Sequence, residues 1–82
     1  VEERKKRLQE AQIFYSNVIR SATAQTDRAL LSLSYVALGR IHEFFGESEY
    51  AVKIYEAAIR IGNVGDSFKE AQAARERLLK EQ

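Results

Sequence analysis

The sequence has no Cys, no Pro and no Met among its 82 residues, and it has only four Gly. Without Cys, a disulfide framework, a thiolate zinc site and a cysteine nucleophile are all excluded. Without Pro, and with so few Gly, little interrupts a helix, and the chain is rich in the good helix formers Ala, Leu, Glu, Lys, Arg and Gln. We therefore expect an all-α protein.

A strong net charge and a long apolar run are also lacking. The net charge is +1, from 13 basic against 12 acidic residues, so no strong field would attract nucleic acid or an anionic membrane. No segment approaches the ~18 apolar residues that a membrane-spanning helix needs. We expect no nucleic-acid partner and no membrane insertion. Because the chain starts at Val and contains no Met, we expect a longer parent protein, which leaves the compartment open.

Apolar residues recur every three or four positions in four segments, as they do along one face of an amphipathic helix. The expected helices cover residues 2–21, 28–45, 48–61 and 67–80. The second is apolar on nearly every side, so we expect neighbouring helices to cover it on several faces. Its candidates for burial are Ala29, Leu30, Leu33, Val36, Ala37, Leu38, Ile41, Phe44 and Phe45.

Residues that begin and end helices stand between these segments. Thr26 or Asp27 is expected to cap the second helix, and Gly46 to end it in the left-handed conformation. The run from Ser67 to Glu70 fits a capping box at the start of the fourth helix. The links after the second and third helices are only a few residues long, which predicts antiparallel helical hairpins.

The middle of the chain carries a spaced motif. It reads Tyr35-x2-Leu38-Gly39-x2-His42, followed by Ala51-x3-Tyr55-x2-Ala58. This run, within residues 31–64, resembles the tetratricopeptide repeat (TPR) family, whose helix–turn–helix unit of about 34 residues carries W-x2-L-G-x2-Y, then A-x3-F, then P. His42 stands where that pattern has an aromatic residue, and Asn63 where it has Pro.

The resemblance implies a fragment of a right-handed superhelix with about four helices, forming one domain over residues 1–82. Residues 2–21 would be the second helix of a partial repeat, 28–61 a full repeat and 67–80 a capping helix with a polar outer face. The long connector after residue 21 is similar to those in bacterial envelope-associated TPR proteins. Both the bacterial cytoplasm and the envelope remain open as locations.

The family binds peptides in a concave groove lined by the first helix of each repeat. Carried over by position, this groove face comprises Leu33, Val36, Arg40, Glu43 and Phe44. Because Val36 and Arg40 stand where the family's carboxylate clamp has Lys and Asn, we expect no such clamp, and a mostly apolar groove suits a hydrophobic helix or segment better. The resemblance thus implies a protein–protein interaction module, an adaptor or scaffold. The alternative is that the fourth helix or a second copy covers this face.

A second candidate surface lies on the first helix. Ile13, Phe14 and Ile19 widen its apolar stripe, and the helix lacks a preceding partner within the sequence. Exposed apolar surface of this size marks a contact, so we expect an upstream helix or a second copy there. The alternative function is therefore structural self-association as a homodimer.

Residues that could carry chemistry are few. His42 is the only His, and Gly46 stands at the position four residues on, where a second ligand or partner would be needed. Glu43 is adjacent in sequence and so points elsewhere on a helix, and we interpret His42 as a packing residue. The basic run from Arg4 to Arg7 is interpreted as a solvated helix start. We expect no enzymatic activity, no cofactor and no metal.

Overall fold

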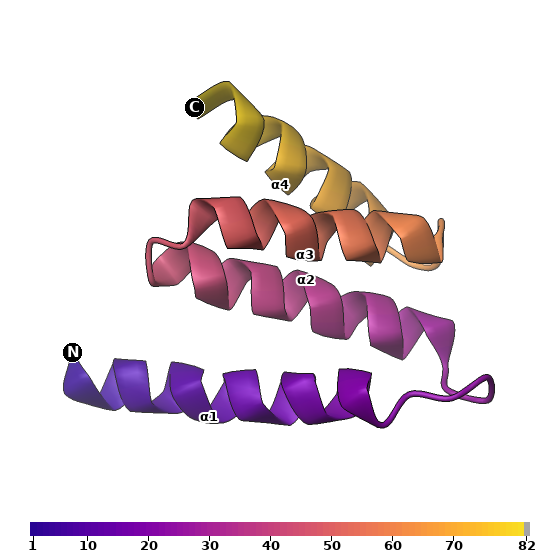
Figure 1. Ribbon diagram of the computed structural model, residues 1–82, viewed down its shortest axis with the longest axis horizontal. Coiled ribbons are helices and arrows are strands. Elements are labelled where there is room, and N and C mark those ends of the chain that lie inside the picture. Colours follow the sequence, from indigo (N-terminus) through magenta and orange to yellow (C-terminus); the bar gives the residue numbers. More distant parts are fainter. Residues whose placement is uncertain (82) are drawn as a thin grey trace.

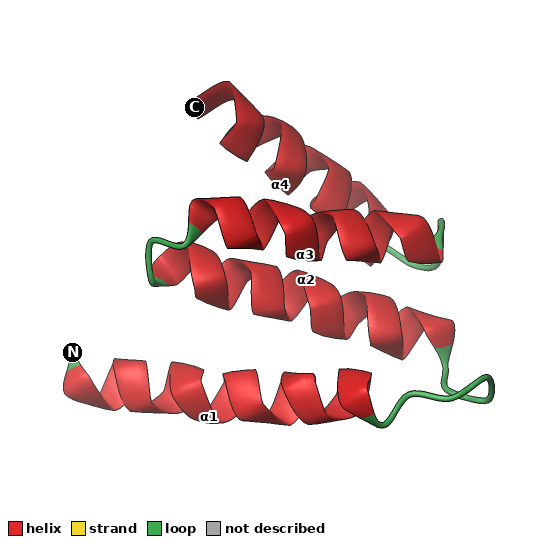
Figure 2. Cartoon of the chain, viewed as in Figure 1, coloured by secondary structure: helices red, strands yellow, loops and turns green. Residues whose placement is uncertain are grey.

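The computed structural model describes residues 1–81, and it consists of helices joined by loops (Figures 1 and 2). The helices are α1 (Glu2–Arg20), α2 (Arg28–Phe44), α3 (Ser48–Ile61) and α4 (Ser67–Glu81). Each lies within one residue of the bounds expected from the apolar periodicity, and α3 matches them at both ends. The all-α expectation is confirmed.

The helices pack as antiparallel hairpins. In Figure 1, α1, α2 and α3 run side by side in alternating directions, and α4 crosses behind one end of α3 at an angle. The central element is α2, which contacts α1, α3 and α4, whereas α1 contacts α2 alone among the described helices. Every other helix therefore depends on α2 or α3 for its position.

The ends of α2 follow its sequence. Asp27 caps the helix, because its Oδ1 accepts a hydrogen bond from the backbone N–H of Ala29 at 2.9 Å. The Thr26 hydroxyl instead accepts from the backbone N–H of Thr23 at 2.8 Å within the connector. Gly46 adopts φ +78° just after the helix, as expected for the turn into α3. Asp27 therefore fixes the start of α2, and Gly46 allows the tight turn from α2 into α3.

The expected capping box at the start of α4 does not form. Ser67 is the first residue of the helix rather than the residue before it, and the backbone N–H of Glu70 donates to the Asp66 carbonyl at 3.2 Å. The Glu70 carboxylate accepts a hydrogen bond from Arg40 on α2 at 2.9 Å. The Glu70 side chain thus bonds to Arg40 on another helix instead of to the backbone at the start of α4.

The closest approach of two helices occurs at Gly39. A Cβ atom at this position would lie 2.5–2.9 Å from three ring atoms of Tyr55 on α3, which is far inside van der Waals contact. The missing side chain lets the Tyr55 ring lie against the α2 backbone, where it is 1% exposed. This pair explains why the Leu-Gly step of the motif stands opposite an aromatic residue.

The core lies where α2, α3 and α4 meet. Its cluster of buried apolar residues comprises Val36, Ala51, Val52, Tyr55, Ala58, Ala71 and Leu78, and Leu38, Ile41 and Ile54 are buried outside this cluster. None of them belongs to α1, which has no buried residue. Burial of apolar surface in α2, α3 and α4 therefore contributes most of the hydrophobic free energy of folding.

The expected burial along α2 is only partly confirmed. Ala29, Leu30, Leu33 and Phe44 are exposed, because the three neighbouring helices leave one side of α2 open. Ser32 and Ser34 are fully buried instead. The Ser34 hydroxyl donates to the Leu30 carbonyl at 2.8 Å, four residues back in its own helix, and small side chains of this kind allow close packing between helices.

Candidate interaction surface

One side of α2 is accessible along its whole length. Leu33, Ala37, Arg40 and Phe44 follow one another at steps of four, three and four residues and so share a face. Leu33 is 49% exposed, Phe44 is 43% exposed, and the Arg40 side chain is 64% exposed. We call this face the α2 stripe. It contains three of the five groove residues that the sequence predicts.

The other two groove residues turn toward α4. Val36 is 1% exposed and belongs to the core cluster with Ala71 and Leu78. The Glu43 carboxylate pairs with the Arg77 guanidinium on α4 through two contacts, Nη1 to Oε1 at 2.9 Å and Nη2 to Oε2 at 3.1 Å. The structure therefore does not bring all five residues to one open groove, because α4 occupies the side of α2 that carries Val36 and Glu43.

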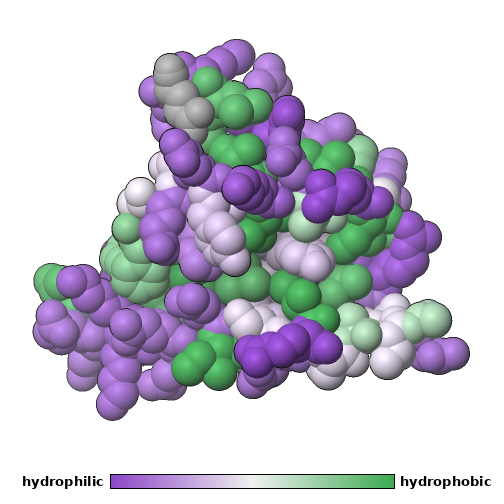
Figure 3. All heavy atoms as spheres, viewed as in Figure 1, coloured by the Kyte–Doolittle hydropathy of each residue, from purple (hydrophilic) through white to green (hydrophobic). Residues whose placement is uncertain are grey.

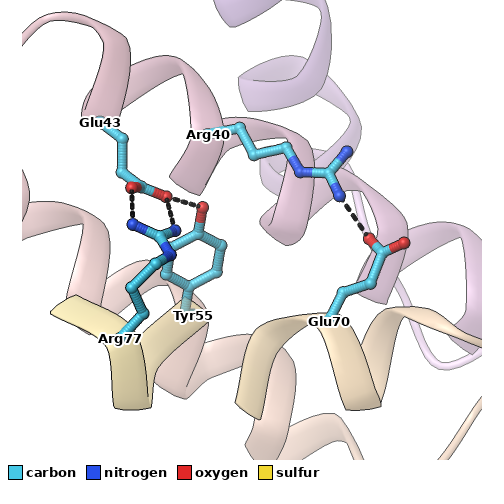
Figure 4. Close-up of polar contacts among 5 residues, drawn as sticks. All are labelled: Arg40, Glu43, Tyr55, Glu70 and Arg77. Atoms are coloured by element: carbon cyan, nitrogen blue, oxygen red, sulfur yellow. Dashed lines mark hydrogen bonds and ion pairs between the residues drawn. The ribbon is translucent and has the colours of Figure 1, made fainter. Parts of the chain in front are cut away.

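A polar network joins α2, α3 and α4 at this point (Figure 4). The hydroxyl of the buried Tyr55 donates a hydrogen bond to Glu43 beside the Arg77 guanidinium. Burial alone would raise the pKa of the Glu43 carboxyl, but the hydrogen bonds from Arg77 and Tyr55, with the charges of Arg77 and Arg40, outweigh burial and hold the pKa below its ordinary value. Burial and the bond to Glu43 raise the pKa of Tyr55. Glu43 is thus an ionised, fully engaged anchor for α4.

A second polar link lies beside it on the same helices. The Arg40 Nη2 donates to Glu70 Oε2 at 2.9 Å (Figure 4). The side chains of Arg40 and Glu70 are 64% and 45% exposed, so water screens the pair and its contribution to stability is small. Arg40 is consequently held between α2 and α4, while most of its side chain remains exposed.

A hollow of about 440 Å³ separates α1 from α2 at one end of the stripe. Its lining residues are Arg4, Leu8, Arg40, Ile41, Glu43 and Phe44. The Arg4 guanidinium lies 5.0 Å from the centroid of the Phe44 ring, within the range of a cation–π contact. Sequence reasoning missed Arg4 by treating it as solvated, although it precedes Leu8 by four residues on the same face of the helix.

The predicted self-association residues do not all come together. Ile13 and Phe14 are 62% and 61% exposed, and the Phe14 ring meets the edge of Tyr15 at 5.3 Å. Ile19 is half-buried and lies on a different side of α1. In Figure 3 a small green apolar patch lies over the middle of α1, with purple hydrophilic residues on both sides of it. Only Ile13 and Phe14 therefore form an open apolar pair.

His42 is packed, as the sequence predicts. It is nearly buried, its ring meets the edge of Tyr50 at 4.6 Å, and its Nδ1 lies 2.9 Å from Glu47 Oε1. Glu47 is a partner that the helical spacing rules did not suggest, because it follows the turn at Gly46. Within residues 1–81 no three metal-ligating side chains converge, and no helix there has the length and apolarity to cross a bilayer.

A larger hollow of about 730 Å³ lies between α3 and α4. Its lining residues are Glu56, Ile59, Arg60, Gln72, Arg75 and Glu76. The Arg75 guanidinium and the Glu56 carboxylate bond across it at 2.8 Å. Because only Ile59 is apolar and two of the charged groups already pair with each other, this hollow offers less to a ligand than the α2 stripe.

Comparison with protein-family models gives no match to this chain, and comparisons with curated proteins and with solved structures give none either. The resemblance to the TPR family therefore stands on the motif residues alone.

Proposed function

We propose that this chain is a TPR-like protein–protein interaction module, without catalytic activity, that binds a peptide or helix of a partner along the α2 stripe. The observation that carries the proposal is the exposure of Leu33 and Phe44 on one face of α2. Apolar side chains at such steps are the anchors that a helix or extended segment uses when it docks in a groove. Exposed apolar groups on a central, well-supported helix cost solubility, so a binding role accounts for them.

The surroundings of the stripe favour the same function. The ion pairs with Glu70 and Arg77 attach α4 on one side, and α1 with its Arg4–Phe44 contact forms the other side. A partner segment lying along α2 would therefore contact three helices. The rigid packing of Gly39 against Tyr55 fixes α2 beneath it, so binding would require little ordering of the backbone.

A second candidate function is self-association through α1, and the exposed pair of Ile13 and Phe14 favours it. Two apolar side chains on one helix make a small contact, since stable interfaces bury on the order of 1,200 Å² or more in total. Self-association would therefore need further residues beside this pair. We rank it below partner binding for that reason.

Two matched double variants separate the functions. L33S/F44S removes two exposed apolar side chains from the α2 stripe, and I13S/F14S removes two from α1. Both should keep the wild-type circular dichroism spectrum, because none of the four side chains is buried. The proposal predicts that proteins retained by the wild-type chain are lost with L33S/F44S and kept with I13S/F14S.

Sedimentation velocity over a range of concentrations tests the alternative on the same proteins. A dimer that L33S/F44S retains and I13S/F14S abolishes would establish self-association through α1. Retention of every partner by L33S/F44S would contradict the proposed function, because the stripe would then contribute nothing to binding.

A further inference from the structure

We infer that the hollow between α1 and α2 receives an acidic, apolar segment of the partner, with Arg4 and Arg40 meeting its carboxylate groups. The inference rests on the proposed function and adds the chemistry of the partner. One of the two cations that line the hollow, Arg4 on α1, lies outside the binding face that the motif predicts.

The floor of the hollow is apolar. Leu8 on α1 and Ile41 and Phe44 on α2 line it, and it continues from the exposed α2 stripe. An occupant must therefore bring at least one apolar side chain, because a wholly polar segment would leave this surface without a partner.

The edge of the hollow is cationic, and its charges are incompletely neutralised. Among the ion pairs of residues 1–81, none involves Arg4, whose guanidinium rests on the Phe44 ring. Arg40 uses one nitrogen for Glu70 and is otherwise largely exposed. Both guanidinium groups thus have donors left for a carboxylate.

The one acid that lines the hollow does not offset these cations. Both carboxylate oxygens of Glu43 are bonded by Arg77, and one of them also accepts from Tyr55. Glu43 therefore cannot turn toward Arg4 without breaking the link to α4. A carboxylate of a partner would pair with the guanidinium groups of Arg4 and Arg40, whereas these groups would repel a basic segment. The complementary occupant is apolar with flanking Asp or Glu.

Three synthetic peptides of about 14 residues, or roughly four helical turns, test the inference. The first has Leu and Phe on one face with Glu on either side of them. The second replaces every Glu with Gln, and the third replaces every Glu with Lys. Each is titrated into the ¹⁵N-labelled chain, and amide shifts report both the affinity and the site.

The acidic peptide should bind about tenfold more tightly than the Gln peptide in low salt, and the difference should shrink at about 0.3 M salt because the charges at the edge are exposed. The shifted amides should cluster at Arg4, Leu8, Arg40 and Phe44. The Lys peptide should bind most weakly of the three.

The substitution R4Q tests the cation directly, and K53Q is its matched control. Lys53 is exposed on α3 and takes no part in an ion pair of the described residues, so both variants lose one positive charge. R4Q should weaken the acidic peptide by up to about fivefold, the range of one exposed charge pair, and leave the Gln peptide unchanged. K53Q should change neither.

Different failures have different meanings. Equal binding of the acidic and Gln peptides at the hollow would overturn the inference about charge while leaving the proposed function standing. An equal loss with R4Q and K53Q would overturn it as well, by showing a general effect of net charge. Shifts confined to Ile13 and Phe14, or no binding by any peptide, would overturn the inference and count against the α2 stripe as the binding surface.

Discussion

The two ends of this molecule are built differently. At one end, α2, α3 and α4 share a core cluster of seven buried apolar residues and a polar network from Tyr55 through Glu43 to Arg77. At the other end, α1 contacts α2 alone and has no buried residue. The first region supplies the buried core, whereas the second contributes no buried side chain and forms one wall of the hollow.

The largest loss of stability should follow Y55A. Tyr55 fills the space opposite Gly39 and is 1% exposed. Its replacement by Ala leaves a cavity and removes the hydrogen bond that the Tyr55 hydroxyl donates to Glu43. Large aromatic-to-Ala changes in cores cost about 3–5 kcal/mol. Urea unfolding should show this loss, and Y50A is the control, since Tyr50 is exposed on the same helix. A similar cost for both variants would contradict the account of the core.

The effect of G39A on stability should change sign when Tyr55 is replaced by Ala. In the wild-type chain the new methyl group meets the Tyr55 ring at 2.5 Å, and such overpacking costs about 1–3 kcal/mol. In a Y55A background the same change should stabilise α2, because Ala is favoured over Gly in a helix by up to about 1 kcal/mol. Urea midpoints of the four proteins form a double-mutant cycle. A destabilisation that persists in the Y55A background would show that the ring is not the obstacle.

The link from Glu43 to α4 should make stability depend on pH in acid. The folded-state pKa of this carboxyl is lowered from 4.5. Its contribution is therefore fully present above the unfolded pKa and is lost as pH falls through the folded one. Urea unfolding from about pH 7 down to about pH 3 should show a steeper fall for the wild type than for E43Q. E49Q is the control, because Glu49 is exposed and takes no part in an ion pair of the described residues. Parallel curves for wild type and E43Q would contradict a lowered pKa.

The smallest effect should come from α1. I13S/F14S should change the free energy of unfolding by less than about 0.5 kcal/mol, as surface substitutions usually do. In hydrogen exchange, the amides of α1 should exchange faster than those of α3, because α1 has one neighbouring helix and no buried side chain. Protection of α1 equal to that of α3 in a monomer would remove the distinction between the two regions.

The sequence predicts the helices well because their signals are local. Periodic apolar residues, Asp27 at the start of α2 and Gly46 at its end are all read from neighbours along the chain, and each is confirmed. The packing of Gly39 on Tyr55 also agrees with the motif spacing. Fold class is thus accessible to sequence reasoning even though no relative was found.

The candidate surface is predicted less completely because it depends on how the helices meet. The direction of α4 decides that Val36 and Glu43 are covered while Leu33 and Phe44 stay open. The same contact draws Glu70 away from a capping box. Arg4 belongs to the surface only because α1 lies antiparallel to α2, which places the start of one helix beside the end of the other.

The most direct test of partner binding by the α2 stripe is site-specific photo-crosslinking. A photoreactive amino acid is placed at Leu33 in one protein and at Ile13 in another, since both positions are exposed and both side chains are apolar. If the α2 stripe binds the partner, illumination with the partner present should yield an adduct from position 33 and little from position 13. An adduct from position 13 alone, to a partner or to a second copy of the chain, would contradict it.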